Sequence, residues 1–136
     1  MTTSTVQFTP EQIVQHYYRA LNARQPALAA PFLAEDVVRI GVMATDGPPH
    51  RTQGKIALLA RMQRIVDDNG ALTVYNVQAA GNTITCSVQI ATDTMRREKI
   101  APLEENAEFL IQDGRIKSYR VVSTPEAMAK IKATTH

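Results

Sequence analysis

Cysteine is almost missing from this 136-residue sequence, and tryptophan is missing altogether. The one cysteine, Cys86, has no partner for an intrachain disulfide, so the chain best fits a reducing compartment. Long apolar runs are also lacking, and the first residues contain no basic segment followed by an apolar stretch. We therefore expect a cytoplasmic protein with neither an export signal nor a membrane span.

An excess of one charge is lacking too. The 15 lysines and arginines nearly balance the 13 aspartates and glutamates, and the basic residues are spread along the chain. Such a distribution does not provide the basic patch that nucleic-acid binding requires. His16, His50 and His136 do not have the spacing of metal ligands, and there is no glycine-rich phosphate loop or GxSxG motif. We expect no nucleic-acid or membrane partner, no metal and no cofactor.

Three helices are predicted in the first half of the chain. Thr9 is a good N-cap residue, and Gln12 stands three positions later in capping-box spacing, so a helix begins here. A second, shorter helical segment contains Pro31, which should kink or divide it. The third helix begins near Gly54 and ends at Gly70, where the Asn-Gly pair is a typical left-handed stop.

β-strands are predicted for most of the second half. Residues 71–123 alternate between apolar and polar side chains with a period of two. Asp113 and Gly114 form a two-residue hairpin turn, and a charged segment at 96–99 connects two of the strands. One earlier strand, rich in β-branched residues, is expected at 37–42, before the third helix.

These elements predict an α+β fold. Residues 126–133 add a short terminal helix, and the whole chain, residues 1–136, is expected to form a single domain. Three N-terminal helices would pack on one face of a curved, mostly antiparallel sheet. Because a curved sheet cannot meet straight helices everywhere, we expect a hollow between the two layers.

Four segments occur in an order that resembles one known superfamily. They are QHYYRALNAR, FLAEDVVRIG, APLEENAEF and DGRIKSYRVV. Together they are similar to the SnoaL-like and ketosteroid isomerase-like proteins of the nuclear transport factor 2-like superfamily. This resemblance implies a cone-shaped, cystatin-like roll with a ligand cavity between helices and sheet, and a homodimer formed through the outer face of the sheet. It also implies cofactor-independent proton transfer of the isomerase, cyclase or dehydratase type.

The resemblance further implies which residues form the site. Tyr17 matches a tyrosine on the first helix that polarises the substrate oxygen in the isomerases. Their protonated acid on a late strand falls on Glu104 or, in a second alignment, on Asn106. Gly41 stands where the isomerases have their proton-moving aspartate, and Asp46 follows in the next loop.

Strand alternation leaves two choices for the side chains that enter the cavity. Glu104, Asn106 and Glu108 share one face, and Phe109 lies with apolar residues on the other. Periodicity alone favours the apolar set facing the helices, whereas the family register turns the glutamates inward. Burial would then raise the pKa of these carboxyls toward neutral pH. On that register we expect Tyr17, Glu104 and Glu108 to be catalytic, and the ligand to contact Asn106, Tyr119, Val121, Met62 and Ile40.

Two functions of different classes follow from this interpretation. The first is an enzyme that moves a proton on a small, mostly apolar, oxygen-bearing molecule. The second is a dimeric ligand-binding or accessory module that has the cavity but not the reaction, which the missing aspartate favours. One fold hosts many activities, so the fold does not decide between them.

Overall fold

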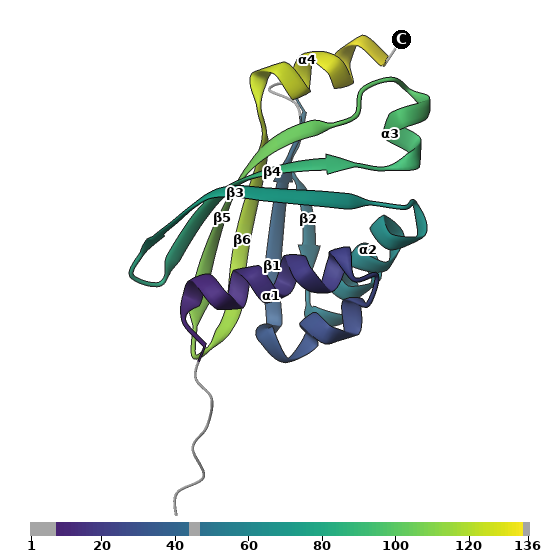
Figure 1. Cartoon of the computed structure of the whole chain (residues 1–136). Coiled ribbons are helices and arrows are strands. Elements are labelled where there is room, and N and C mark those ends of the chain that lie inside the picture. Colours follow the sequence, from purple (N-terminus) through teal and green to yellow (C-terminus); the bar gives the residue numbers. More distant parts are fainter. Residues whose placement is uncertain (1–7, 44–46, 135–136) are drawn as a thin grey trace, which may run out of the picture.

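A six-stranded sheet forms the body of the molecule (Figure 1). The computed structural model describes residues 8–43 and 47–134, so Asp46 and His136 lie outside the described residues. The elements in chain order are α1 (Pro10–Asn22), the 3-10 helix η1 (Pro26–Phe32), β1 (Leu33–Val42), β2 (His50–Gln53), α2 (Lys55–Asp67), β3 (Ala71–Ala80), β4 (Thr83–Ala91), α3 (Asp93–Arg97), β5 (Leu103–Gln112), β6 (Arg115–Ser123) and α4 (Pro125–Thr134).

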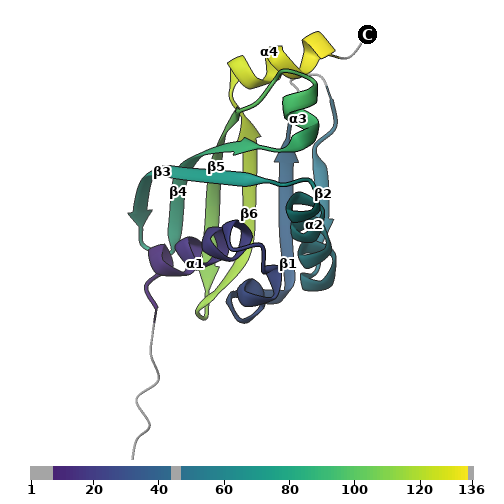
Figure 2. The same ribbon diagram turned by 45° about the vertical axis from the view of Figure 1, so that its right-hand side comes forward.

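The strands lie in the order β2-β1-β6-β5-β4-β3. β1 pairs with β6 in parallel, and the other neighbouring strands pair antiparallel. The sheet bends strongly, with α1 and α2 on its inner face and α3 and α4 near one end (Figures 1 and 2). The predicted α+β class and the curved, mostly antiparallel sheet are confirmed.

The start of α1 follows from its capping residues. The Thr9 side chain accepts a hydrogen bond from the Gln12 backbone at 3.1 Å, and the Gln12 side chain accepts one from the Thr9 backbone at 2.9 Å. This reciprocal pair satisfies two N–H groups that the helix itself leaves without partners. The predicted capping box is confirmed, and it fixes the rotation of α1 so that Tyr17 faces the sheet.

Three elements differ from the expectation. The segment with Pro31 forms a 3-10 helix, a tighter coil used in short pieces, rather than a divided α-helix. The charged connection contains the short helix α3, because the Thr92 hydroxyl accepts a hydrogen bond from the Met95 backbone and caps it. His50 begins a four-residue strand that pairs with β1. None of the helices in the described part is long and apolar enough to cross a membrane.

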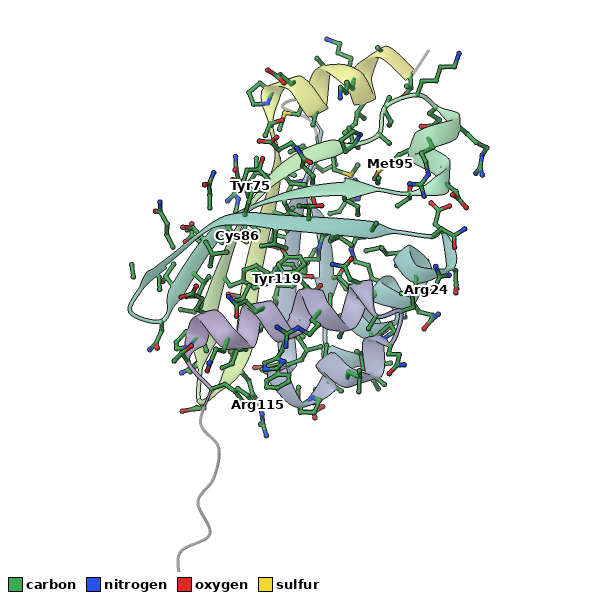
Figure 3. The ribbon with its side chains drawn as sticks, in the orientation of Figure 1. Arg24, Tyr75, Cys86, Met95, Arg115 and Tyr119 are labelled. Atoms are coloured by element: carbon green, nitrogen blue, oxygen red, sulfur yellow. The ribbon has the colours of Figure 1, made fainter. Side chains whose placement is uncertain are left out.

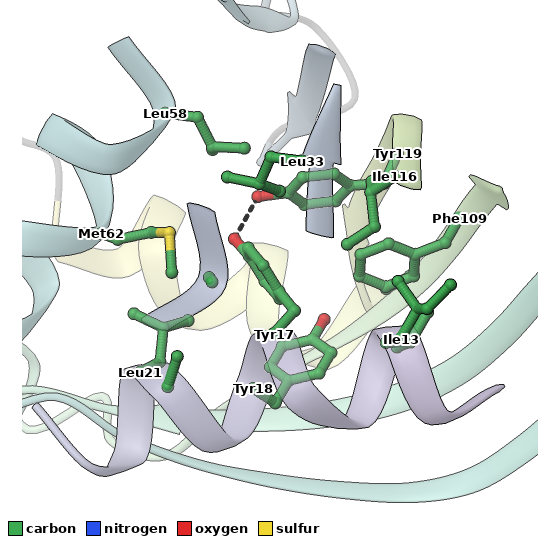
Figure 4. Packing of buried hydrophobic residues seen from close by; sticks show 14 of the residues in the cluster. Ile13, Tyr17, Tyr18, Leu21, Leu33, Leu58, Met62, Phe109, Ile116 and Tyr119 are labelled. Carbon is green, nitrogen blue, oxygen red and sulfur yellow. Dashed lines mark hydrogen bonds between the residues drawn. The ribbon is translucent and has the colours of Figure 1, made fainter. Parts of the chain in front are cut away.

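The main core lies between α1, α2 and the inner face of the sheet (Figure 4). Phe109 of β5 is fully buried, with its ring 4.6 Å from that of Tyr119 and 5.9 Å from that of Tyr17. Leu58 and Met62 close the core from α2. The aromatic side chains therefore lie between α1 and the sheet. The rest of the inner face of the sheet carries smaller and charged side chains.

Candidate functional site

An internal cavity of about 80 Å³ lies beside this aromatic cluster. That volume holds a few waters or the reacting end of a small ligand. Its lining comes from α1, α2, α3 and five strands of the sheet, and most of it is apolar. The polar side chains among the lining residues are Tyr17, Tyr18, Arg39, Arg61, Glu105 and Tyr119.

Two tyrosines form a buried pair at the cavity wall. The hydroxyls of Tyr17 on α1 and Tyr119 on β6 lie 2.5 Å apart, and the residues are only 3% and 4% exposed (Figures 3 and 4). Burial and the neighbouring Tyr119 raise the pKa of Tyr17 well above its ordinary value. Burial also raises the pKa of Tyr119, but the charge of Arg39 and the hydrogen bond with Tyr17 oppose this. Either hydroxyl can be the donor, and the hydroxyl that accepts keeps its own proton for a further hydrogen bond.

Arg39 lies next to this pair. It projects from β1, is 8% exposed, and its guanidinium carbon lies 5.8 Å from the centre of the Tyr119 ring. A Cβ atom at Gly41 would lie 2.6 Å from Nη1 of Arg39, which is closer than real Cβ contacts come. The guanidinium thus lies over Gly41.

Glu105 is the acidic group of the cavity. It projects from β5, and burial raises the pKa of its carboxyl above the ordinary value, while the charges of Arg39 and Arg61 lower it. Arg61 reaches the cavity from α2, and burial, followed by the charge of Arg39, lowers its own pKa. The ion pairs within residues 8–43 and 47–134 all involve other residues, namely Lys55–Glu35, Arg96–Asp93 and Lys117–Asp36.

The expectation that Glu104 and Glu108 point into the cavity is wrong. Glu108 and Asn106 are exposed on the outer face of the sheet and line a groove there with Arg120. Glu104 lies on the same outer face, where its hydrogen bond with Tyr75 raises the pKa of that tyrosine. Because side chains alternate along a strand, a shift of one residue in the assumed register moves the whole set to the opposite face. The structure brings the apolar set of Phe109, together with Glu105, to the inside.

Of the other predicted site residues, some line the cavity and one lies on the outer face of the sheet. Tyr17, Tyr119, Val121 and Met62 come together as lining of the cavity, so their predicted roles can act at one place. Ile40 does not join them, because it alternates with Arg39 along β1 and lines a hollow on the outer face.

Three functional candidates were missed from the sequence: Arg39, Arg61 and Glu105. The sequence did contain a signal for Arg39. In a strand it shares a face with Val37 and Gly41, and a single charge on a face without other polar side chains indicates a specific role. Arg61 stands three residues after Leu58 on the border of an apolar helix face.

Neither His16 nor His50 lines this cavity. His16 stacks on the ring of Phe32 at 4.9 Å and meets Phe8 edge to face at 4.7 Å. His50 is exposed at the start of the edge strand β2. In the portion of the chain that is described, no three residues of the types His, Cys, Asp and Glu are grouped so as to hold a metal ion.

Comparisons with known proteins were made at three levels. No family model matches the sequence, and no curated protein matches it significantly. Solved structures do match. A nuclear transport factor 2-like protein of unknown function from Cytophaga hutchinsonii aligns with a TM-score of 0.73 and 17% identity, over 93% of this chain and 99% of its own. A putative ketosteroid isomerase from Kribbella flavida aligns with a TM-score of 0.69 and 21% identity, over 85% and 77%. A putative polyketide cyclase from Sinorhizobium meliloti aligns with a TM-score of 0.65 and 19% identity, over 84% and 99%.

Proposed function

We propose that this chain, which has the nuclear transport factor 2-like fold, is a cofactor-independent enzyme that moves a proton on a small, oxygen-bearing molecule. The observation that supports this is the meeting of two kinds of group in one small cavity. Glu105 is a carboxyl whose pKa burial raises toward the range of a general base. The Tyr17–Tyr119 pair is a hydrogen-bond donor for an oxygen.

The proposed reaction begins when the carbonyl oxygen of the substrate accepts a hydrogen bond from Tyr119. The Glu105 carboxylate removes a proton from the carbon next to that carbonyl. The electron pair of the C–H bond forms a double bond to the carbonyl carbon, and the π pair of the carbonyl moves to the oxygen. Tyr119, supported by Tyr17, stabilises the resulting oxyanion, and the charges of Arg39 and Arg61 add to this stabilisation. Glu105 then returns the proton to another carbon. Alternatively, the enolate attacks a second carbonyl carbon of the substrate and closes a ring, and the new alkoxide takes the proton from Glu105, or the enolate expels a hydroxyl that takes this proton and leaves as water. These outcomes correspond to isomerase, cyclase and dehydratase chemistry.

The remaining lining sets the substrate class. Leu21, Met62, Leu103 and Val121 present apolar surface around the polar groups. A molecule that is mostly apolar and carries one or two oxygens satisfies both kinds of surface, because the apolar atoms leave water while the oxygen keeps a donor.

The test is exchange of hydrogen for deuterium at the carbons beside the carbonyl of 2-butanone, followed by proton NMR in D2O. Glu105→Gln keeps the shape of the side chain but removes the base, so exchange should fall by roughly 10²- to 10⁴-fold. Tyr119→Phe removes the donor, and exchange should fall by about 10²- to 10³-fold. The matched controls are Glu108→Gln on the outer face of the same strand and Tyr75→Phe on β3, and both should exchange like the unaltered protein.

Equal exchange in Glu105→Gln and Glu108→Gln would contradict the proposal. If 2-butanone binds to the unaltered protein but no exchange above the buffer rate occurs, the chain is instead a ligand-binding or accessory module. Its missing aspartate at Gly41 would then be the reason, since no other base would act in its place.

We also propose that the chain forms a homodimer through the outer face of the sheet, in a reducing cytoplasm. Leu110 is 44% exposed on that face, and Ile40 and Val122 lie half-buried on it. Association would remove these apolar side chains from water. Cys86 is buried and free, as a reducing compartment allows.

A further inference from the structure

A second, larger pocket adjoins the cavity. It has a volume of about 360 Å³ and lies between α2, α3 and α4, at the end of the sheet where α4 crosses it (Figure 2). The two spaces adjoin, because six residues line both: Met43, Arg61, Ile65, Ile90, Met95 and Leu103. We refer to this second space as the outer pocket.

The outer pocket is apolar inside and charged at its rim. Ile100 and Ile131 continue the apolar wall that Met95 and Leu103 begin. Arg64, Asp68 and Glu98 line the same pocket and supply its charged groups. Methionine is unbranched and polarisable, so the wall can adapt to an apolar guest of irregular shape.

Helix α3 carries Met95, which is labelled in Figure 3. Hydrogen bonds hold this helix in place. The Thr92 hydroxyl accepts from the Met95 backbone at 3.2 Å, and the Asp68 carbonyl accepts from the Asp93 backbone at 2.8 Å. The Asp68 carboxylate accepts from the Thr94 backbone at 3.3 Å, and hydrogen bonds from the side chain of Thr94, then from the side chain of Thr92 and the backbone of Thr94, lower the pKa of Asp68. The end of α2 thereby holds α3, which carries Met95, a residue that lines both spaces.

We propose that the outer pocket binds the apolar body of the substrate, which is an elongated chain carrying a carbonyl group near one end. This rests on the proposed function for the position of the carbonyl group. The cavity of about 80 Å³ admits only the reacting end, whereas the adjoining 360 Å³ lies within the usual size of ligand pockets. Arg61 lines both spaces, so the substrate passes the Arg61 guanidinium at the point where its reacting end joins its apolar body.

The test uses the methyl ketones 2-butanone, 2-heptanone and 2-undecanone, with affinities measured by NMR titration of the full chain. Each added methylene that enters the outer pocket should tighten binding roughly fourfold, until the pocket is full. Ile131→Ala shortens the wall on α4 and should weaken binding of 2-undecanone at least fivefold while leaving 2-butanone unchanged. Ile100→Ala should have the same selective effect, because Ile100 lines the outer pocket and not the cavity. The matched control is Ile56→Ala, the same substitution at a residue of α2 that is 86% exposed, and it should bind all three ketones normally.

The outcomes separate this inference from the proposed function. The proposed role of the outer pocket would be refuted if affinity did not depend on the chain length of the ketone, or if Ile131→Ala and Ile56→Ala bound 2-undecanone equally well. Neither result would contradict the exchange reaction of 2-butanone. A chain-length effect that Ile131→Ala reduces, without any exchange, would support the outer pocket and refute the catalytic role. Failure of all three ketones to bind would refute both.

Discussion

The position of the Arg39 guanidinium over Gly41 gives a sharp prediction for Gly41→Ala. The new Cβ atom would lie 2.6 Å from Nη1 of Arg39 and 3.4 Å from its Cζ. The atoms that it meets form the end of a flexible side chain rather than backbone, so the guanidinium should move and the fold should survive. The backbone of Gly41 is outside the left-handed region, so alanine itself is not strained there.

The expected magnitude comes from three contributions. In a strand without the clash, alanine in place of glycine should stabilise the fold by about 0.5–1 kcal/mol. Forcing Arg39 away from its preferred side-chain angles costs about 0.5–1.5 kcal/mol, and loss of its contact with the Tyr119 ring costs about 1 kcal/mol. We expect Gly41→Ala to destabilise the protein by about 1 kcal/mol, because the two losses exceed the gain.

A double-mutant cycle with Arg39→Met is the appropriate assay. In the Arg39→Met background there is no guanidinium to displace, so Gly41→Ala should be neutral or stabilising, and the coupling between the two changes should reach about 2 kcal/mol. Urea unfolding of the four proteins at neutral pH measures it. If Gly41→Ala has the same effect in both backgrounds, the guanidinium does not lie over Gly41 and our explanation of this glycine is refuted.

Two further predictions concern pH and association. Because burial raises the pKa of Glu105, the folded state favours the neutral carboxyl. The stability that the neutral carboxyl contributes is fully present below the ordinary glutamate pKa, and it is lost as the pH rises through the pKa of Glu105 in the folded state. Glu105→Gln should therefore be more stable than the unaltered protein in urea unfolding at about pH 8 and lose this advantage at about pH 4, and an advantage that is equal at both pH values would contradict the burial of this carboxyl. Leu110→Glu should convert the proposed homodimer into a monomer in sedimentation experiments, and a monomeric unaltered protein would refute the dimer.

The local elements could be predicted because nearby residues determine them. The capping box of Thr9 and Gln12 fixes where α1 begins. Asp113 and Gly114 both have positive φ angles, 53° and 74°, as a tight hairpin turn requires. Even the burial of Tyr17 follows from its place on the apolar face of α1.

The acidic group of the site could not be predicted from the family register. Glu104 and Glu105 are adjacent, and one of them must face each side of the sheet. The register that placed Glu104 inward rested on a short, degenerate segment, and an error of one residue was enough to exchange the two faces. Periodicity predicted the correct face, the one that carries Phe109. The free energy gained by burying Phe109 and Ile111 outweighs any preference of the glutamates for one face.

The meeting of Arg39 with Arg61 could not be identified for a different reason. The alternation of β1 marks Arg39 as a charge on an apolar face, but no local pattern shows that β1, α2 and β6 come together at one cavity. An arginine in a strand ordinarily reaches water along its long side chain. Arg39 is only 8% exposed, so its burial in the fold removes that route.

The parallel pairing of β1 with β6 determines when the site comes into being. Arg39 and Tyr119 are direct neighbours across this pair, although β6 is the last strand of the chain. During synthesis α1 and β1 emerge first, and Tyr17 then has no hydroxyl opposite its own. A nascent chain that has not yet released its final hairpin accordingly lacks the Tyr17–Tyr119 hydrogen bond, which joins the first helix to the last strand.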